Sequence, residues 1–367
     1  MKSLNDDLKY WVSFSKIPGI GRVKIDLLLK HFGNLANAWK AKNIELNTIG
    51  IDEKLTTAIA QGKNTIMPDR EIENLEKYQV KAIPYLAPQY PKRLLEINDY
   101  PPILFVRGSL LPSDELSIAV VGTRRVSVYG RQVTEEIVTD LVQSNVTIIS
   151  GLAKGIDSIA HKTALEINGR TISVFASGLD IVYPSENLQM AKRIMENGAL
   201  ISEYPLGTKP KAENFPRRNR IMSGLSLGVL VIEAGEKSGA LITADQALSQ
   251  NREVFAVPGS IFSPYSKGTN KLIQQGAKLV KNYMDILEEL NLVNIATQLE
   301  VKDLLQVDPG EAILLENLSA EPKHIDEICR VSGLSAQIVG SRLAILELKG
   351  IIKQVSNLNY VLAKRMR

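Results

Sequence analysis

The sequence has few of the residues that would point to an extracellular, membrane-embedded or metal-dependent protein. Its single cysteine, Cys329, excludes an intrachain disulfide and is typical of the reducing cytosol. The three histidines, His31, His161 and His324, lie far apart, so no metal-ligand spacing is present. No apolar run approaches the roughly 18 residues that a membrane span needs, and the polar start, Met1–Asp7, is unlike a signal peptide. We therefore expect a cytoplasmic protein with no membrane segment and no bound metal.

Length and composition bound the domain organisation. The chain has 367 residues, of which 44% are hydrophobic and 23% charged, which argues against wholesale disorder. This length suggests two or three domains. Pattern changes predict a helical-hairpin domain at residues 1–70, an α/β domain at 71–292, a linker at 293–309 and a winged helix at 310–367. The net charge is only +4, so the placement of the charges says more about nucleic-acid binding than their sum does.

The first region contains a glycine turn ahead of an apolar helical stretch. Residues 17–21 include Gly19 and Gly21, and a helical pattern follows over residues 23–31. Glycines at this spacing form a tight turn, and the next helix begins with free backbone N–H groups that suit a phosphate. A second copy at residues 46–51 lacks the paired glycines. The region therefore looks like a helix-hairpin-helix unit, whose glycines either contact DNA or only cap a scaffold helix.

The central region alternates short β-branched runs with helical stretches, the pattern of a mostly parallel α/β sheet. Several runs are nearly continuous in Val and Ile, as expected for strands covered on both faces. The expected strands are Ile103–Val106, Ile118–Val121, Thr147–Ser150, Ile172–Phe175, Leu200–Ser202, Val229–Ile232, Val254–Val257 and Ala277–Val280. The expected helices include Gly130–Gln143, Ile156–Ile167, Leu188–Glu196 and Ala240–Ser249. We therefore predict an extended Rossmann-like domain.

The C-terminal region has the order helix, helix, helix, hairpin that is typical of a winged helix. The expected elements are Ala312–Leu318, Ile325–Val331, Ser335–Leu348 and a hairpin over Ile351–Leu362. Its expected recognition face carries Gln337, Ser341 and Arg342. Residues 311–350 contain six acids against four Lys/Arg, so electrostatics do not favour duplex binding there. A protein-contact or structural role fits at least as well as reading a DNA groove.

Three turns of the central region have unusual side chains. The first is Gly122-Thr123-Arg124-Arg125, directly after a strand and ahead of a helix. Glycine lets the backbone approach a ligand, the helix start presents N–H groups, and the arginines offer planar donor forks to a phosphate. The alternative is an ordinary turn with two solvated arginines.

The second turn lies between the strand ending at Ser150 and the next helix. Gly151 and Gly155 bracket it, and Lys154 lies within it, directly before Gly155. Asp157 either caps the following helix or orients the lysine. His161, one helical turn further on, is expected to be a packed histidine rather than a catalytic one.

The third turn lies in a basic segment. Residues 209–220 contain five Lys/Arg against one acid, with Phe215 in the middle. Cations that follow a backbone, together with a ring on which a base stacks for roughly 1–3 kcal/mol, are the parts of a single-strand site. A run of charge can also be a solvated loop. The candidate binding residues here are Phe215, Arg217, Arg218, Asn219 and Arg220.

A further helix start holds Ser238, Gly239 and Thr243, which either donate to a phosphate or cap the helix. Enzyme signatures are missing around it. The first turn lacks the G-x-G-x-x-G of a dinucleotide site, and residues 235–238 lack the paired glycines of a Walker loop. No pair of carboxylates follows the strand ends as in a two-metal nuclease. We expect no catalytic residue and no cofactor.

These motifs occur together and in a fixed order. Gly122-Thr123-Arg124, residues 150–157, residues 215–226, residues 238–244 and Val257-Pro258-Gly259 together resemble the DNA-processing protein A family (DprA, also called Smf). The resemblance covers the whole central region, and the flanking modules also fit. Any one motif is weak evidence, whereas the ordered set is specific. One departure is Thr123, where the family often has serine, a change that keeps the hydroxyl.

The resemblance implies a recombination mediator without catalytic activity. Such proteins bind and protect incoming single-stranded DNA during natural transformation and help load RecA onto strands covered by single-strand-binding protein. They act as dimers formed through the Rossmann-like domain. The resemblance also implies that Arg124 and Lys154 clamp phosphates and that Phe215 stacks a base. The cations it places along the path of the strand are Arg217, Arg218 and Arg220.

Two other functions stay open at this point. One is a nucleotide hydrolase of the lysine-decarboxylase-like Rossmann family, which uses a Pro-Gly-Gly-x-Gly-Thr-x-x-Glu stretch. The nearest analogue here, Pro258-Gly259-Ser260, has no acid in place. The other is a protein adaptor in which DNA contact is incidental.

Overall fold

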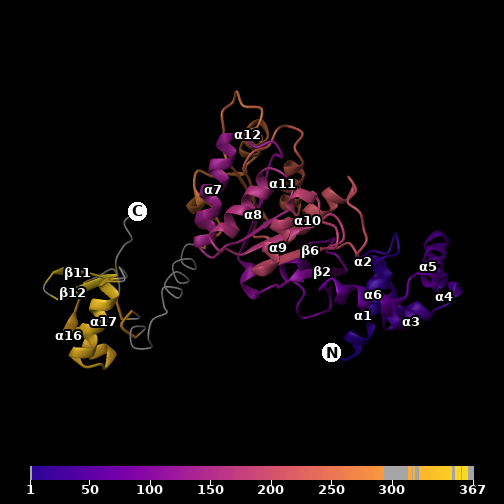
Figure 1. The fold of residues 1–367 in the computed structure, drawn as a ribbon, viewed down its shortest axis with the longest axis horizontal. Coiled ribbons are helices and arrows are strands. Elements are labelled where there is room, and N and C mark those ends of the chain that lie inside the picture. Colours follow the sequence, from indigo (N-terminus) through magenta and orange to yellow (C-terminus); the bar gives the residue numbers. More distant parts are fainter. Residues whose placement is uncertain are drawn as a thin grey trace. The chain divides into compact units, whose positions relative to one another are not determined.

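The structure is a computed structural model that describes residues 2–292, 313–315, 317–318, 322–348, 352–356 and 358–362 (Figure 1). It contains two compact units, Met1–Val293 and Asn294–Arg367. The expected linker at residues 293–309 lies outside the described residues. Among those described, no helix combines the length and apolar character needed to cross a membrane.

The N-terminal segment consists of short helices joined by turns that need glycine. Gly19 (φ +91°) precedes one helix and Gly50 (φ +85°) another, so both predicted hairpins contain a left-handed turn residue. Asn34 and Asp52 cap the starts of two helices by accepting the backbone N–H groups of Asn37 and Leu55. The helices are α1 (Lys2–Ser15), α2 (Arg22–Phe32), α3 (Leu35–Lys40), α4 (Asn43–Thr48), α5 (Glu53–Thr65) and α6 (Pro68–Lys77). The expected domain boundary at residue 70 lies within α6.

The remainder of the first unit is built around a sheet. Within the described residues, nine strands lie in the order β1-β2-β6-β5-β4-β3-β7-β8-β9. The neighbours from β6 to β9 are parallel, and β1 and β2 extend the sheet in antiparallel pairs. The strands are β1 (Lys81–Pro84), β2 (Ile103–Gly108), β3 (Ser117–Val121), β4 (Thr147–Ser150), β5 (Thr171–Val174), β6 (Gly198–Ser202), β7 (Gly228–Val231), β8 (Glu253–Ala256) and β9 (Lys278–Leu279).

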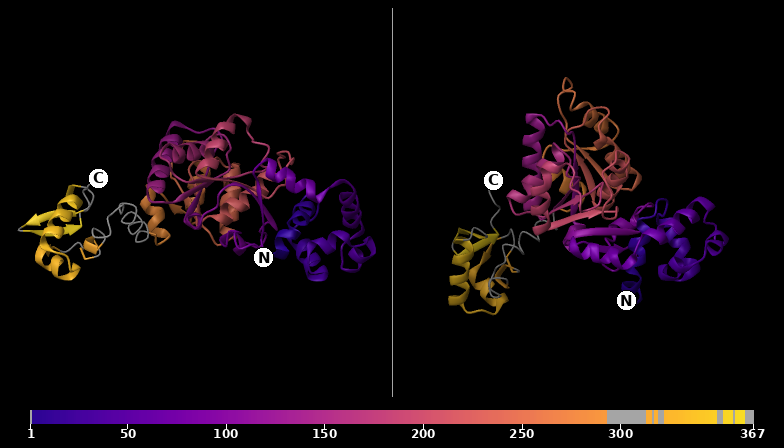
Figure 2. Two further views of the ribbon diagram at one scale, coloured as in Figure 1. Left: turned by 60° about the horizontal axis from the view of Figure 1, so that its bottom comes forward. Right: turned by 45° about the vertical axis from the view of Figure 1, so that its right-hand side comes forward.

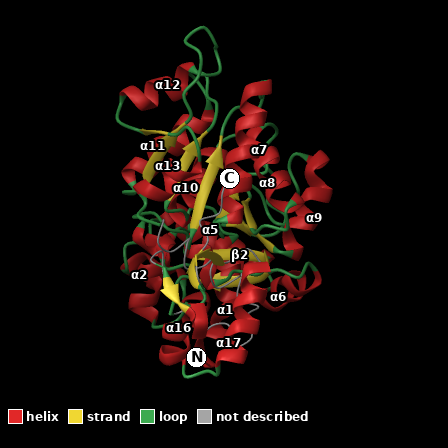
Figure 3. Cartoon of the chain, turned by 90° about the vertical axis from the view of Figure 1, so that its left-hand side faces the viewer, coloured by secondary structure: helices red, strands yellow, loops and turns green. Residues whose placement is uncertain are grey.

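Helices cover both faces of this sheet (Figure 3). One face packs against α7 (Val128–Gln143), α8 (Ile156–Glu166) and α9 (Leu188–Glu196). The other packs against α10 (Asn214–Leu225) and α11 (Gly239–Ser249). The helices α12 (Lys267–Gln274) and α13 (Tyr283–Glu289) follow β8 and β9. The predicted Rossmann-like fold is confirmed, and its strand order reverses between β3 and β7. Ligands of open α/β sheets bind at the carboxyl ends of the strands beside such a switch point.

The N-terminal helices share a hydrophobic core with the sheet. Trp11 and Phe14 of α1 belong to the same buried cluster as Phe105 of β2 and Leu200 of β6. Helices α1 and α6 pack against β1, a strand that the sequence did not predict. Figure 2 shows the N-terminal helices, in indigo and purple, beside the sheet. The helical segment is therefore fixed to the β1–β2 end of the sheet.

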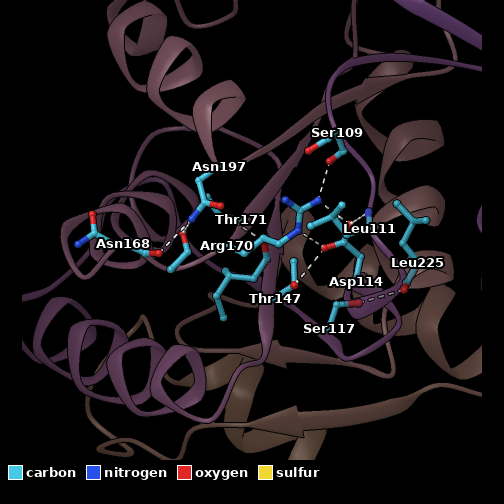
Figure 4. A network of polar contacts seen from close by, with 12 residues as sticks. Ser109, Leu111, Asp114, Ser117, Thr147, Asn168, Arg170, Thr171, Asn197 and Leu225 are labelled. Carbon is cyan, nitrogen blue, oxygen red and sulfur yellow. Dashed lines mark hydrogen bonds and ion pairs between the residues drawn. The ribbon is translucent and has the colours of Figure 1, made fainter. Parts of the chain in front are cut away.

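An ion pair joins two segments that lie at the amino ends of the strands, Asp114 before β3 and Arg170 before β5 (Figure 4). Arg170, just before β5, donates from Nε and Nη2 to the two carboxylate oxygens of Asp114, at 2.5 and 2.7 Å. Arg170 also donates to the Ser109 carbonyl oxygen, and the Thr147 hydroxyl donates to Asp114. Both charged side chains are nearly buried. These contacts link the segment before β3 to the starts of β4 and β5. They lie at the amino ends of the strands, whereas ligands of such sheets bind at the carboxyl ends.

The second unit is a small winged helix, as predicted. Its described elements are β10 (Lys323–His324), α16 (Ile325–Ser332), α17 (Ala336–Leu348), β11 (Ile352–Ser356) and β12 (Asn359–Leu362). The three strands form a sheet in the order β10-β12-β11, and Gly333 (φ +69°) ends α16. Leu314, Ile328, Val339 and Leu343 are buried between them. On α17, Gln337 and Ser341 are exposed, and Arg342 is half-buried.

Candidate nucleic-acid interface

A pocket of about 540 Å³ opens at the carboxyl ends of β3 and β7, beside the switch point. Three polypeptide turns and the first turn of α10 form its walls. We call this hollow the switch pocket. Its lining residues include Gly122, Thr123, Arg124, Arg125, Ala153, Asp157, Phe215, Pro216, Arg218, Asn219, Lys237, Ser238, Gly239, Thr243 and Tyr265.

The turn between β3 and α7 is held to the end of β7. The Thr123 N–H donates to the Glu233 carbonyl oxygen at 2.8 Å. Glu233 is buried, and its carboxylate accepts from both the backbone N–H and the hydroxyl of Ser127. Ser127 in turn caps α7 by accepting the Gly130 N–H at 3.0 Å. Arg124 and Arg125 therefore extend, exposed, from a turn with a fixed backbone.

The turn between β4 and α8 packs directly against the first turn. Gly155 has φ +81°, and a Cβ placed on it would lie 2.3 Å from the Thr123 carbonyl oxygen. The Ile156 N–H donates to that same oxygen at 3.2 Å. No residue other than glycine fits this position without moving one of the turns.

Asp157 organises the inside of the same turn. Its carboxylate accepts the backbone N–H groups of Gly151 at 3.2 Å and Ala153 at 3.4 Å. Burial raises the pKa of this carboxyl group, while the nearby Arg218 charge opposes that shift. Asp157 therefore fills neither of the two expected roles. No side chain caps α8, and Lys154 pairs with Glu186, while Asp157 holds the backbone of the turn in place.

Lys154 lies next to the switch pocket rather than in its wall. Its Nζ forms an ion pair with Glu186 Oε2 at 2.7 Å, and both side chains are more than half exposed. Exposed pairs of this kind contribute about 0–1 kcal/mol. A phosphate could replace Glu186 as the partner of Lys154 at little energetic cost.

The planar side chains of Arg124, Phe215 and Tyr183 lie next to one another. The Arg124 guanidinium lies 5.7 Å from the centroid of the Phe215 ring. The Tyr183 ring meets Phe215 edge-on, with centroids 5.8 Å apart. Tyr183 is half-exposed and was not identified from the sequence. The signal that could have found it is an aromatic residue in the loop that follows the expected strand Ile172–Phe175.

From Asn214 on, the basic segment is helical, which corrects the expectation of a turn or a solvated loop; residues 209–213 precede the helix. Residues 214–220 form the first two turns of α10, so neighbouring side chains point to different sides. Phe215, Arg218 and Asn219 line the switch pocket, whereas Arg217 and Arg220 line hollows beside the N-terminal helices. The three arginines therefore do not form one row.

Arg218 is a buried structural arginine, with 4% of its surface exposed. It donates to the carbonyl oxygens of Gly151, at 2.8 Å, and Val174, and its Nε donates to Asn219. A Cβ on Gly151 would lie 2.4 Å from the guanidinium, so this glycine makes room for it. Burial lowers the pKa of Arg218 to about 10. The structure thus makes Arg218 a buried part of the pocket wall, and does not place it along an exposed strand path as expected.

The start of α11 completes the switch pocket. Ser238 caps this helix by accepting the Ala240 N–H at 3.3 Å, and Thr243 is buried in its second turn. A Cβ on Gly239 would meet nothing within 4 Å, so the helix start is open to the pocket. Lys237, exposed at the rim, adds a cation that the sequence analysis did not single out. A helix N-terminus with nearby cations attracts anions.

The described residues contain no group of three or more His, Cys, Asp and Glu side chains that could hold a metal ion. His161 is fully buried, with Nδ1 2.7 Å from the Thr171 hydroxyl, and burial lowers its pKa to about 3. Chemically, the pocket combines cations, the N-terminus of a helix and an aromatic ring, groups that suit a ligand with both a phosphate and a base.

Comparison with known proteins identifies the family. Residues 81–291 match the model of the family described as DNA recombination-mediator protein A, and residues 300–357 match the DprA winged helix domain. The chain belongs to the DprA family. Protein Smf of Synechocystis sp. is 35% identical to it, across 97% of this chain and 99% of that protein. Members of this family are DNA-processing proteins.

Two solved DprA structures share the fold. The X-ray structure of DprA from Streptococcus pneumoniae has a TM-score of 0.66 at 35% identity and covers 77% of this chain and 97% of that one. DNA processing protein A from Helicobacter pylori, described for its single-stranded DNA binding mode, has a TM-score of 0.53 at 31% identity. That comparison covers 58% of this chain and 95% of the other.

Proposed function

We propose that this protein binds single-stranded DNA in the switch pocket, without catalysis, and helps load RecA onto the bound strand. The observation that supports this most is the Arg124–Phe215 pair at a pocket bordered by the start of α11. The Helicobacter pylori relative, described for its single-stranded DNA binding mode, supports the same proposal.

The parts of the switch pocket suit the parts of a nucleotide. Arg124, Arg125 and Lys237 border the pocket, and Lys154 stands beside it, so four cations are available to phosphates. Phe215 and Tyr183 offer ring surface to unpaired bases, and base stacking is indifferent to sequence. We therefore expect binding that prefers single strands over duplex and depends weakly on base sequence.

The wider role follows the family. We propose that the protein protects incoming single strands during natural transformation and acts as a homodimer formed through the Rossmann-like domain. Its proposed partners are RecA and single-strand-binding protein. RecA ATPase activity on strands coated with single-strand-binding protein measures loading, and it should rise on addition of the wild-type protein.

Binding is tested by fluorescence anisotropy with labelled oligothymidylate at several salt concentrations. Four phosphate contacts predict a slope of log K against log salt of about −3, from roughly −0.7 per contact on a single strand. Arg124→Ala should weaken binding about tenfold and reduce the slope by about 0.7. Arg70→Ala, on the exposed face of α6, removes the same charge away from the pocket and serves as the matched control. Equal binding by all three proteins would overturn the proposal.

A further inference from the structure

The proposed function leaves the N-terminal glycine turn and Arg217 without a role, and the two meet in a second hollow. A pocket of about 480 Å³ is lined by Gly19, Gly21, Arg22 and Lys24 on one side and by Glu203, Arg217 and Arg220 on the other. We call it the hairpin pocket. Gly19, Gly21 and Arg217 also line an adjoining hollow of about 410 Å³ that reaches Tyr204.

The two pockets lie along the same edge of the sheet. The switch pocket is at the carboxyl ends of β3 and β7, whereas Glu203 and Tyr204 directly follow the carboxyl end of β6. Between them in the sheet are β4 and β5, whose carboxyl ends lead into the Lys154 turn and the Tyr183 loop. Adjacent strands are spaced about 4.8 Å apart, so the path from β7 to β6 is about 19 Å long.

The hairpin pocket has groups that suit a phosphate. Arg217 is exposed and makes no hydrogen bond or ion pair within the described residues. Lys24 has only a long contact of 3.5 Å to the Gly50 carbonyl oxygen. In the part of the chain described, neither Arg22 nor Val23 donates its backbone N–H to a protein acceptor, and no side chain caps α2.

The acidic groups near the hairpin pocket form ion pairs with two of its arginines, although Oε1 of Glu203 accepts no hydrogen bond. Arg220 forms ion pairs with Glu203 and with Asp99, the latter at 3.3 Å. Arg22 pairs with Asp26 at 3.1 Å. The cations that form no ion pair in the described residues are therefore Arg217 and Lys24, one from each side of the pocket. The charge of Arg217 still acts on the Glu203 carboxylate, whose pKa burial raises and the nearby arginines lower.

The helical segment is held rigidly enough to form one surface with the sheet. Arg22 donates to the Asn98 carbonyl oxygen at 3.1 Å, and its guanidinium lies 4.8 Å from the centroid of the Tyr100 ring. The Tyr85 hydroxyl donates to Asp26 of α2 at 2.7 Å. These contacts position the glycine turn opposite Arg217 before any ligand binds.

We propose that a single strand bound in the switch pocket continues past β4 and β5 and places a backbone phosphate in the hairpin pocket, between Arg217 and the turn that starts α2. This inference rests on the proposed function and extends it. It makes the N-terminal hairpin part of the single-strand site, and it predicts that affinity keeps rising once a strand is long enough to reach β6.

The test compares two oligothymidylates, one of roughly four nucleotides and one of about fifteen, within the range of site sizes known for single-strand binders. The proteins are the full chain, Lys24→Ala/Arg217→Ala, and Lys40→Ala/Arg70→Ala. The last pair removes one lysine and one arginine from exposed positions of the same helical segment that border none of these pockets. Anisotropy is recorded across salt concentrations, and thermal melting confirms folding.

We expect the Lys24→Ala/Arg217→Ala protein to bind the long strand about tenfold more weakly, with a salt slope shallower by about 1.4, from two contacts at roughly 0.7 each. Its binding of the short strand should match the full chain. If the long and short strands lose affinity equally, or neither does, the inference is wrong while the proposed function stands. Failure of the unaltered protein to bind either strand overturns both.

Discussion

Replacing Gly155 with alanine tests whether contact between two turns sets the geometry of the switch pocket. Gly155 has φ +81° and ψ −128°, a region that side chains with a Cβ rarely adopt. The added methyl would also lie 2.3 Å from the Thr123 carbonyl oxygen and 2.8 Å from the backbone of Arg124. Because both neighbours are backbone atoms, no side-chain rotation relieves the clash.

Two effects of different size follow. Backbone strain at such a position costs roughly 1–3 kcal/mol of folding free energy. Ordinary van der Waals contact begins near 3.4 Å. The Thr123–Arg124 backbone must therefore move away from the new Cβ by about 1.1 Å, the difference between 3.4 and 2.3 Å. A hydrogen bond to a charged group contributes about 1.5–3 kcal/mol, so loss of the Arg124 contact should weaken single-strand binding by tenfold or more.

Gly33→Ala is the control that separates backbone strain from displacement of the Arg124 turn. Gly33 also has a positive φ, +79°, but a Cβ there meets nothing within 4 Å, and the residue ends α2 away from the switch pocket. Both variants should melt several degrees below the wild type, since about 1 kcal/mol shifts Tm by roughly 2–4 °C in a domain of this size. Only Gly155→Ala should lose affinity in anisotropy at 25 °C. Wild-type affinity in folded Gly155→Ala would refute the reasoning.

Three further perturbations give distinct outcomes. Arg218→Ala leaves two buried carbonyl groups and Asp157 without their cation, so urea unfolding should show a loss of about 3–5 kcal/mol; a loss below about 1 kcal/mol would contradict its structural role. Phe215→Ala should weaken binding by about 1–3 kcal/mol while Phe215→Tyr keeps it, because only the ring stacks; equal affinities in anisotropy would count against stacking. Burial lowers the pKa of His161 to about 3, so below about pH 6.5 the unfolded chain takes up a proton that the folded chain does not. From pH 7 to pH 4.5 the wild type should therefore lose about 2–3 kcal/mol of stability relative to His161→Gln, and parallel pH profiles would contradict this.

Much of the fold was predictable because its signals are local. The runs of Val and Ile predicted eight strands of the sheet to within a few residues, since strands covered on both faces must be apolar throughout. Gly122 and Gly155 marked turns in which the backbone needs room, and the structure shows their neighbours packed closely. β1 was missed because its four residues include a proline and a lysine, and it forms only through pairing with β2.

Tertiary structure decided which of the arginines is buried, which is ion-paired and which is exposed. In sequence, Arg217, Arg218 and Arg220 look alike, and the run suggests one basic stripe. Helical geometry in α10 turns Arg218 inward, where the carbonyl groups of Gly151 and Val174 replace water, while Arg220 meets Glu203 from the end of β6. Those partners are 17 to 67 residues away in the chain, so no local pattern could show which arginine is buried.

The sequence by itself determined which segments become strands, where glycine is required, and that the cationic turns follow the carboxyl ends of parallel strands. It did so because propensity and periodicity depend on neighbours a few residues apart. Only the folded chain decided which of the cations remain free to bind. Burial and charge pairing are set by long-range packing, which brings the Gly19 turn of the first helices opposite Arg217, nearly two hundred residues further along the chain.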